Sequence, residues 1–540
     1  MKVTAFAAKK APFRWLWGKI LQRIGLLIFV LAVLGPLLVL VVQTVPLLLG
    51  GNGGWLALAL PTGRRLGLLL NSLGFAAAVA AAGVILGTLG GSILWRWDEG
   101  WRAYLRWLII VLAPIPPYIH ALAWNSLINS VNSLLQGSGF PAIQLQGWIG
   151  SWWVQLMALA PIAVGLALVG LKSVEPSMID AARMMRSDIS SLAKVVLPLA
   201  APALMAAGGI LFLLSLVDYS VPSLFNLNVY SLEIFAEYSA SNEPARALIL
   251  SFPLLIIAVA VVLASLSPLR NAAQSSSWHI PAWKVAPVWP KWFVSLQWVA
   301  VAILAGQIAV PLLSLITAAG TWHDLVSAIL AAHSEITFSF WIDILVAVLC
   351  LPIALATAGE LVSSKKWERL LWILVIAPLA IPPSLIGIGL IAIWNRPLIF
   401  DVYGSSLMPV LAGLARFTPL AVIILVAQLR RINPLLIEAA SILQAGPWQT
   451  WRRIWLPMLS PGLLAAAGIV FALTAGELGA TLLVAPPGQA TLTMRIYNFL
   501  HYGASGAVAG LCLMMAITTL LAGAVAVAAL VKWSNLSPKP

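Results

Sequence analysis

Long apolar windows alternate along the chain with short polar segments. A transmembrane helix needs about 20 consecutive apolar residues, and about twelve windows meet this length. They lie near residues 21–49, 66–95, 105–124, 148–171, 199–222, 247–267, 295–318, 336–359, 370–394, 408–429, 459–482 and 506–531. The pattern predicts an all-α polytopic membrane protein with about twelve transmembrane helices.

The composition agrees with this class. Hydrophobic residues make up 61% of the 540 residues and charged residues only 9%, and the mean hydropathy is +0.99. The first window is too long for a signal peptide and no A-x-A cleavage site follows it, so we expect it to span the membrane. Cys350 and Cys512 both fall inside apolar windows, which argues against a disulfide framework and against metal binding by cysteine.

The net charge of +14 would point to nucleic acid in a soluble protein, but here its distribution follows the membrane. With a cytoplasmic N-terminus, most Lys and Arg residues fall in cytoplasmic segments, as the positive-inside rule requires. The predicted outer loops hold few basic residues: Arg64, Arg65, Arg246, Arg396 and Arg495. We therefore expect both termini in the cytoplasm and no nucleic-acid partner, with Arg64 and Arg65 as an unexplained local exception.

The two parts of the chain repeat one another. The stretch "LPLAAPALMAAGGILF" from Leu197 matches "LPMLSPGLLAAAGIVF" from Leu456, and "APIPP" at 113–117 echoes "APLAIPP" at 377–383. Six windows in each part begin and end on the same side, which predicts parallel repeats about an axis along the membrane normal. The predicted division is a cytoplasmic N-terminal segment (1–20), a first half (21–268), a cytoplasmic linker (269–294) and a second half (295–540).

Each half carries one polar segment, at residues 172–198 and 430–457. In the second, Asn433 and Pro434 predict a helix start, Gly446 with Pro447 a stop, and "WQTWRRIW" a second short helix before the chain returns to the membrane. The first segment predicts the same helix-turn-helix. From the residues alone two interpretations stay open: an amphipathic hairpin on the lipid surface, or a rigid knob that docks a partner.

These segments resemble the EAA loop of the permease subunits of bacterial ABC importers, in which this element is the coupling helix. The residues that carry the motif are Glu438, Ala439, Ala440, Leu456 and Pro457, with Asp180, Ala181, Ala182, Leu197 and Pro198 in the first half. The motif's usual glycine is replaced by Arg186 and Gln444, although Gly446 lies close by. The resemblance covers almost the whole chain, as two fused six-helix halves of the type I importer permease fold in a bacterial cytoplasmic membrane.

The resemblance also implies partners. These are two copies of an ABC ATPase subunit and a periplasmic or extracellular solute-binding protein, in addition to membrane lipid. The chain has no G-x-x-x-x-G-K-[ST] loop, so ATP and Mg are expected on the separate ATPase and no cofactor on this chain. No HExxH, GxSxG or His/Cys cluster occurs either, which predicts a transport subunit with no metal site and no enzymatic activity.

The outer-loop sequence "APPGQATLTMRIYNFLHYGA" at 485–504 is most similar to iron(III)-type and thiamine-type permeases, and "VYSLEIFAEYSA" at 229–240 takes its place in the first half. The resemblance implies a solute such as iron(III), thiamine or a related cationic compound. The residues expected on the binding-protein side are Glu233, Tyr238, Arg495, Tyr497 and Tyr502.

Three charges lie where apolar windows make them costly. Arg416 lies about 12 Å deep in a hydrocarbon layer of about 30 Å, and such residues normally have a partner. Glu477 lies about 6 Å below the outer surface by the same rise, within reach of Arg416. Asp218 occupies the equivalent position in the first half, but Ala158 stands where the arginine would be. We expect all three acidic and basic residues to line the translocation path; the alternative is that both acids are hydrated at the outer boundary.

Two other functions remain open at this stage. An ion-coupled secondary transporter also commonly has twelve spans in two parallel halves, but it needs no paired cytoplasmic knobs. An integral-membrane enzyme acting on lipid-linked substrates would need clustered acidic or metal-binding residues, and the sequence shows none.

Overall fold

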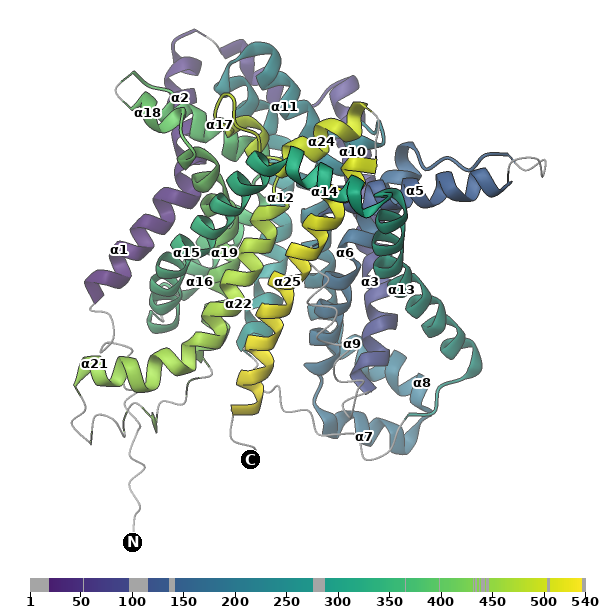
Figure 1. Ribbon diagram of the computed structural model, residues 1–540. Coiled ribbons are helices and arrows are strands. Elements are labelled where there is room, and N and C mark those ends of the chain that lie inside the picture. Colours follow the sequence, from purple (N-terminus) through teal and green to yellow (C-terminus); the bar gives the residue numbers. More distant parts are fainter. Residues whose placement is uncertain are drawn as a thin grey trace.

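The computed structural model describes residues 19–51, 53–96, 115–135, 141–274, 287–364, 366–397, 399–430, 432, 435–436, 438, 442, 446–502 and 506–536. Within these residues the regular structure is entirely helical (Figure 1). The predicted all-α polytopic class is therefore confirmed.

The helices follow one another in two similar series. Those before residue 275 are α1 (Lys19–Phe29), η2 (Val30–Leu34), α2 (Gly35–Leu49), η3 (Gly53–Ala59), α3 (Arg64–Arg96), α5 (Pro117–Leu135), α6 (Gly147–Lys172), α7 (Pro176–Met185), α8 (Asp188–Ser191), η4 (Leu192–Val196), α9 (Leu197–Val217), α10 (Ser220–Leu224), α11 (Tyr230–Ser241) and α12 (Pro244–Gln274). Those after it are α13 (Lys291–Ala318), α14 (Trp322–Ala331), α15 (His333–Ser363), α16 (Glu368–Ile376), η5 (Ala377–Ala380), α17 (Pro383–Trp394), α18 (Phe400–Tyr403), α19 (Leu407–Arg430), α21 (Pro447–Thr450), η6 (Trp451–Trp455), α22 (Leu456–Ala475), α23 (Thr481–Val484), α24 (Leu492–Tyr502) and α25 (Gly506–Leu536).

The described residues contain 10 helices long and apolar enough to cross a membrane, or 11 if one bent pair counts as a span. The prediction of about twelve spans differs from the described structure at two places. Residues 370–394 form two helices that meet at 100°, because Pro382 and Pro383 cannot continue a helix from the preceding turn. Of the predicted span 105–124, residues 105–114 lie outside the described residues, and the remainder leads into α5, which runs across one end of the bundle (Figure 1).

Each of the three π-helical turns, η2, η4 and η6, is separated from a following proline by one residue. The N–H of Gly35 bonds to Val30 O, and the N–H groups of Leu197 and Leu456 bond five residues back in the same way. Pro36, Pro198 and Pro457 follow directly and have no N–H to donate. The missing bond explains why the chain widens by one residue at these points, a feature often found at functional positions.

The first helix of each series packs against the other series. Helices α1 and α2 lie against α15 and α17, while α13 lies against α5. A Cβ on Gly25 would come within 2.2 Å of the Ala356 side chain, so α1 and α15 touch at backbone distance. Phe29 and Val33 belong to the same buried cluster as Trp372 in α16. The hydrophobic core therefore joins the two series into one bundle.

The short helices gather at the two ends of this bundle. Helices α7, α8 and α21 lie at one end, together with the start of α1 and the end of α25 (Figure 1). Helices α10, α11, α14, α18 and α24 lie at the opposite end (Figure 1). The two polar segments singled out in the sequence thus share one end, and the segments predicted for the outer side share the other.

Candidate coupling segments and translocation path

The first polar segment folds as the predicted helix-turn-helix. Helix α7 begins at Pro176, and Ile179 on its inner face is buried, whereas Asp180 and Ala181 are exposed and Ala182 is half-buried. The chain turns before α8 and enters α9 through η4, with Leu197 half-buried and Pro198 exposed. The acidic residue predicted to contact a partner is therefore available at the surface of this end.

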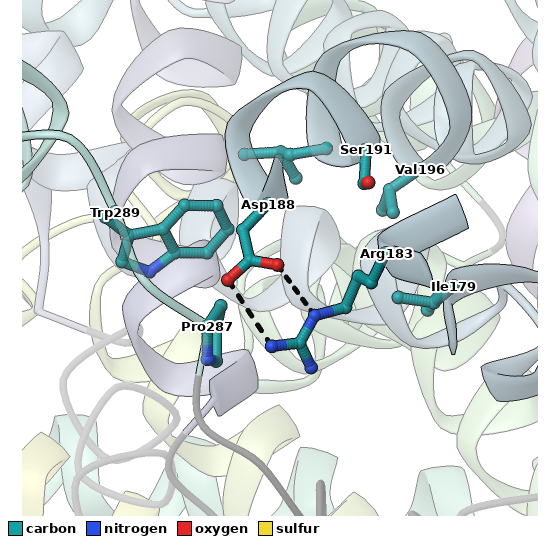
Figure 2. A pocket seen from close by; sticks show the side chains of 8 residues that line it. Ile179, Arg183, Asp188, Ser191, Val196, Pro287 and Trp289 are labelled. Carbon is teal, nitrogen blue, oxygen red and sulfur yellow. Dashed lines mark hydrogen bonds and ion pairs between the residues drawn. The ribbon is translucent and has the colours of Figure 1, made fainter. Parts of the chain in front are cut away.

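An ion pair closes the turn between α7 and α8. Arg183 Nε donates to Asp188 Oδ1 at 2.7 Å, and the guanidinium also donates to Asp188 Oδ2 at 3.3 Å. The same carboxylate accepts the backbone N–H of Val288, which lies just before α13. Figure 2 shows the small pocket around this pair, with Trp289 beside it. Sequence analysis did not identify Asp188 as a connecting residue, since Val288 lies 100 positions farther along the chain.

The second polar segment is described only in part. Glu438 is helical and half-buried, while Ala439 and Ala440 lie outside the described residues. Gly446 is not helical, and α21 begins at Pro447, close to the start of the predicted second short helix. Leu456 and Pro457, both exposed, then open α22 after η6.

Arg416 and Glu477 form an ion pair at the end of α22. The Glu477 side chain is fully buried, and its carboxylate also accepts the N–H groups of Ala480 and Thr481, at 3.1 and 2.9 Å. Arg416 extends from α19 and is partly exposed. The pairing inferred from the depths of the two residues is present in the structure, and whether it lines a path stays a prediction.

Asp218 occupies the corresponding point at the end of α9, and among the described residues it forms no ion pair like that of Glu477. Its Oδ1 accepts the N–H and the hydroxyl of Ser220, at 3.0 and 2.7 Å. Its Oδ2 is buried, and among the described residues it has no hydrogen-bond partner. In the second half, Arg416 therefore neutralises Glu477. In the first half, one carboxylate oxygen of Asp218 is left without a hydrogen-bond partner among the described residues.

Two hydrogen bonds join the loops that follow these acids. The Tyr219 hydroxyl donates to Gly479 O at 3.1 Å, and the hydroxyls of Ser223 and Tyr497 are 2.8 Å apart. Tyr219 is buried and stacks on Phe235, with ring centroids 5.7 Å apart. The two series thus meet through polar contacts at the end of the bundle opposite α7 and α21. Sequence analysis did not find Tyr219 or Ser223, because neither belongs to a charge pattern or motif.

The remaining residues predicted for the binding-protein side lie at this end as well. Glu233 accepts two bonds from Arg64, at 2.8 and 2.9 Å, and Arg495 pairs with Glu335 at the start of α15. Tyr238 and Tyr497 are both buried, and burial raises the pKa of each hydroxyl above its ordinary value. Tyr502 ends α24, and its side chain lies outside the described part. Among the described side chains, Glu233, Arg495, Tyr238 and Tyr497 are each paired or buried, so none of these four is a freely exposed contact.

The pairing on this end also explains the two arginines that departed from the positive-inside pattern. Arg64 pairs with Glu233, and Arg65 shares Glu237 with Arg246. Glu237 follows Glu233 by one helical turn, the signal that could have predicted a paired acidic face on α11.

Among the described residues, no three His, Cys, Asp or Glu side chains gather into a group that could hold a metal ion, and both cysteines are free and buried. Asp343, in α15, is a buried acid that the sequence analysis passed over.

Residues 350–532 match the family described as "Binding-protein-dependent transport system inner membrane component". The match covers about a third of the chain, within the second half. The matched region runs from α15 to α25 and includes the second polar segment and Glu477. The resemblance to importer permeases drawn from the Glu-Ala-Ala and Leu-Pro residues is thereby confirmed.

Two relatives align with this chain over different lengths. The chain is 31% identical over 169 residues to the putative 2-aminoethylphosphonate transport system permease protein PhnV of Salmonella typhimurium, an alignment that covers 31% of this chain and 62% of that relative. It is 22% identical over 451 residues to the Fe(3+)-transport system permease protein FbpB 2 of Haemophilus influenzae, covering 81% of this chain and 84% of the relative. The second alignment extends the similarity into the region before residue 350.

Proposed function

We propose that this chain is the transmembrane permease subunit of an ATP-binding-cassette importer in a bacterial cytoplasmic membrane. The observation that carries the proposal is the position of the two polar segments at one end of the bundle, each entering a membrane helix through a π turn and a Leu-Pro pair. Helices α9 and α22, connected in this way, transmit a displacement of the polar segments to the loops at the opposite end of the bundle. Those loops hold Asp218 and Glu477.

We assign ATPase coupling to these two segments. In each, the acidic residue (Asp180 or Glu438) meets a basic rim on one ATPase copy, and the small alanines permit close approach of the backbones. The exposure of Asp180 and Ala181 supports this assignment. The two halves, 21–268 and 295–540, then act as a pseudo-dimer that binds two ATPase copies, with both termini in the cytoplasm. ATP and Mg belong to that partner, as the family's division of labour implies.

The solute is delivered by a binding protein that docks at the end formed by α11 and α24, and it carries a positive charge. The support is the unsatisfied carboxylate oxygen of Asp218 beside the contacts between the two halves. The relatives fit this charge: one is named for Fe(3+) and the other for 2-aminoethylphosphonate, a compound with an amine. Fe(3+) is a cation, and 2-aminoethylphosphonate has an ammonium group beside its negatively charged phosphonate, so each solute offers a positive group that a carboxylate attracts.

Uptake by the reconstituted permease tests the proposal. Proteoliposomes would hold the permease and its ATPase, with ATP inside and the binding protein and radiolabelled solute outside. We expect uptake that requires internal ATP and persists when ionophores collapse all ion gradients. Uptake that ignores ATP and stops with the ionophores would instead show a secondary transporter.

A further inference from the structure

The carboxylate of Asp188 connects three separate segments of the chain. It pairs with Arg183 on α7 (Figure 2). It also lies in the first turn of α8 and accepts the N–H of Val288 in the segment that leads into α13. Only 13% of its side chain is exposed, and 16% of that of Arg183. A largely buried carboxylate needs such partners, since an unpaired one is costly. The contact therefore orders all three segments together.

Apolar packing supports the same junction. Phe293, in the first turn of α13, lies in one buried cluster with Ile179 of α7 and with Leu192 and Val196 of η4. Trp289 packs against Phe293, with ring centroids 5.1 Å apart, and also lines the pocket beside Asp188. The inner face of the first polar segment is thus covered by the beginning of the second half.

Helix α13 is also fixed farther along its length to the first half. Gln297 Nε2 donates to Ser92 Oγ of α3 at 2.9 Å, a buried contact. If α7 and α8 moved while α13 stayed in place, the hydrogen bond between Asp188 and Val288 would break. If α13 moved with them, the hydrogen bond between Gln297 and Ser92 would be strained. The geometry makes this helix a connection between the first polar segment and the body of the bundle.

We propose that Asp188 is a positioning residue that ties the first ATPase-coupling segment to α13, so that the segment and the start of the second half move as one unit. The coupling role of the segment rests on the proposed function, but the tie itself does not. The sequence of the second polar segment has no equivalent of the Arg183–Asp188 pair. When Leu456 is aligned with Leu197, Pro447 takes the position of Asp188. When Glu438 is aligned with Asp180, Ser441 takes the position of Arg183.

Hydrogen exchange of the full-length permease in detergent tests the tie without any partner. In Asp188→Asn, we expect the amides of α7, α8 and residues 288–293 to exchange together, roughly tenfold faster, the size expected when a hydrogen bond to a charged group is weakened. Asp188→Glu keeps a carboxylate and should recover most of the protection. Asp180→Asn, an exposed acid on the same helix, serves as the matched control and should change neither region.

A charge exchange separates the tie from the ion pair alone. Arg183→Asp combined with Asp188→Arg restores opposite charges between α7 and α8, but an arginine cannot accept the N–H of Val288. We expect protection to return in α7 and α8 and to stay low at 288–293. Recovery at all three segments, or unchanged exchange at 288–293 in Asp188→Asn, would overturn the proposal.

The effect on coupling is read separately in proteoliposomes, as solute molecules moved per ATP hydrolysed. Asp188→Asn should lower this ratio severalfold while the ATPase still binds. A normal ratio together with the expected exchange pattern would reject the role in coupling and leave the tie standing. If the wild-type permease does not bind the ATPase at all, the proposed function is contradicted, whatever the exchange data show.

Discussion

The Tyr219 hydroxyl donates a hydrogen bond to the backbone carbonyl of Gly479, at 3.1 Å and across 260 positions of sequence. The bond joins the loop after α9 to the loop after α22, the two places where the repeated Leu-Pro helices end. A Cβ on Gly479 would approach Pro383 at 2.7 Å, so the loop passes too close to α17 for a larger residue. The contact closes the end of the bundle opposite the polar segments.

Tyr219→Phe should make that end open more readily. A neutral hydrogen bond contributes about 1 kcal/mol, so its loss should shift a closed-to-open equilibrium by about fivefold. We expect ATP hydrolysis by the reconstituted complex, measured without binding protein, to rise by up to this factor. The matched control is Tyr230→Phe, which removes a bond to Leu250 O of 2.9 Å within the first half. An equal rise in both variants would contradict a specific closing role for Tyr219.

Glu477→Gln should destabilise the protein by stranding Arg416. Removing one partner of a buried ion pair typically costs 3–5 kcal/mol; because the Arg416 side chain is 29% exposed, we expect on the order of 2–3 kcal/mol. The readout is the midpoint of thermal unfolding in detergent, together with the amount of protein in the membrane. Arg416→Ala should also destabilise, and the double variant should lose less than the sum of the two single variants. Strict additivity would show that the pair contributes nothing.

Asp218→Asn should lower uptake of a cationic solute at least severalfold and leave folding intact. An asparagine oxygen still accepts the bonds from Ser220, so only the charge facing the solute is lost. Initial uptake rates and binding-protein-stimulated ATP hydrolysis are measured side by side, and the second should be preserved. Asp401→Asn, at an exposed acid of α18, is the control. Wild-type uptake by Asp218→Asn would remove this residue from the path.

Charge reversal at the two coupling segments should uncouple hydrolysis from uptake. Glu438→Lys and Asp180→Lys each place a positive charge where the proposal puts a basic rim of the ATPase, so uptake should fall about tenfold or more, while insertion into the membrane is unchanged. Glu175→Lys, at an exposed position just before α7, controls for added charge at this end. Unchanged uptake in both variants would remove the acidic residues from coupling.

Much of the fold could be predicted because membrane helices follow directly from apolar length and proline position. The sequence pattern placed α6 and α19 to within a few residues, and it anticipated the turn between α7 and α8. It did not anticipate the bend before α17 or the direction of α5. Both depend on how prolines redirect a helix against its neighbours, and an apolar window carries no information about direction.

Sequence analysis predicted the part of the site in which a charged residue within an apolar window required a partner. The depth of Arg416 in its window was enough to propose Glu477 as its partner. Tyr219 and Ser223 carry no charge, and their importance comes only from the meeting of two distant loops. Asp188 has a partner five residues away and another 100 residues away, and only the tertiary structure shows the second.

The mass of the intact complex tests the central claim most directly. The permease would be co-expressed with a candidate ABC ATPase from the same bacterium, purified by a tag on the permease, and measured by native mass spectrometry. The account predicts one permease chain with two ATPase copies, because each half of a single chain carries its own coupling segment. A complex with two permease chains, or a permease that purifies without any ATPase, would contradict it.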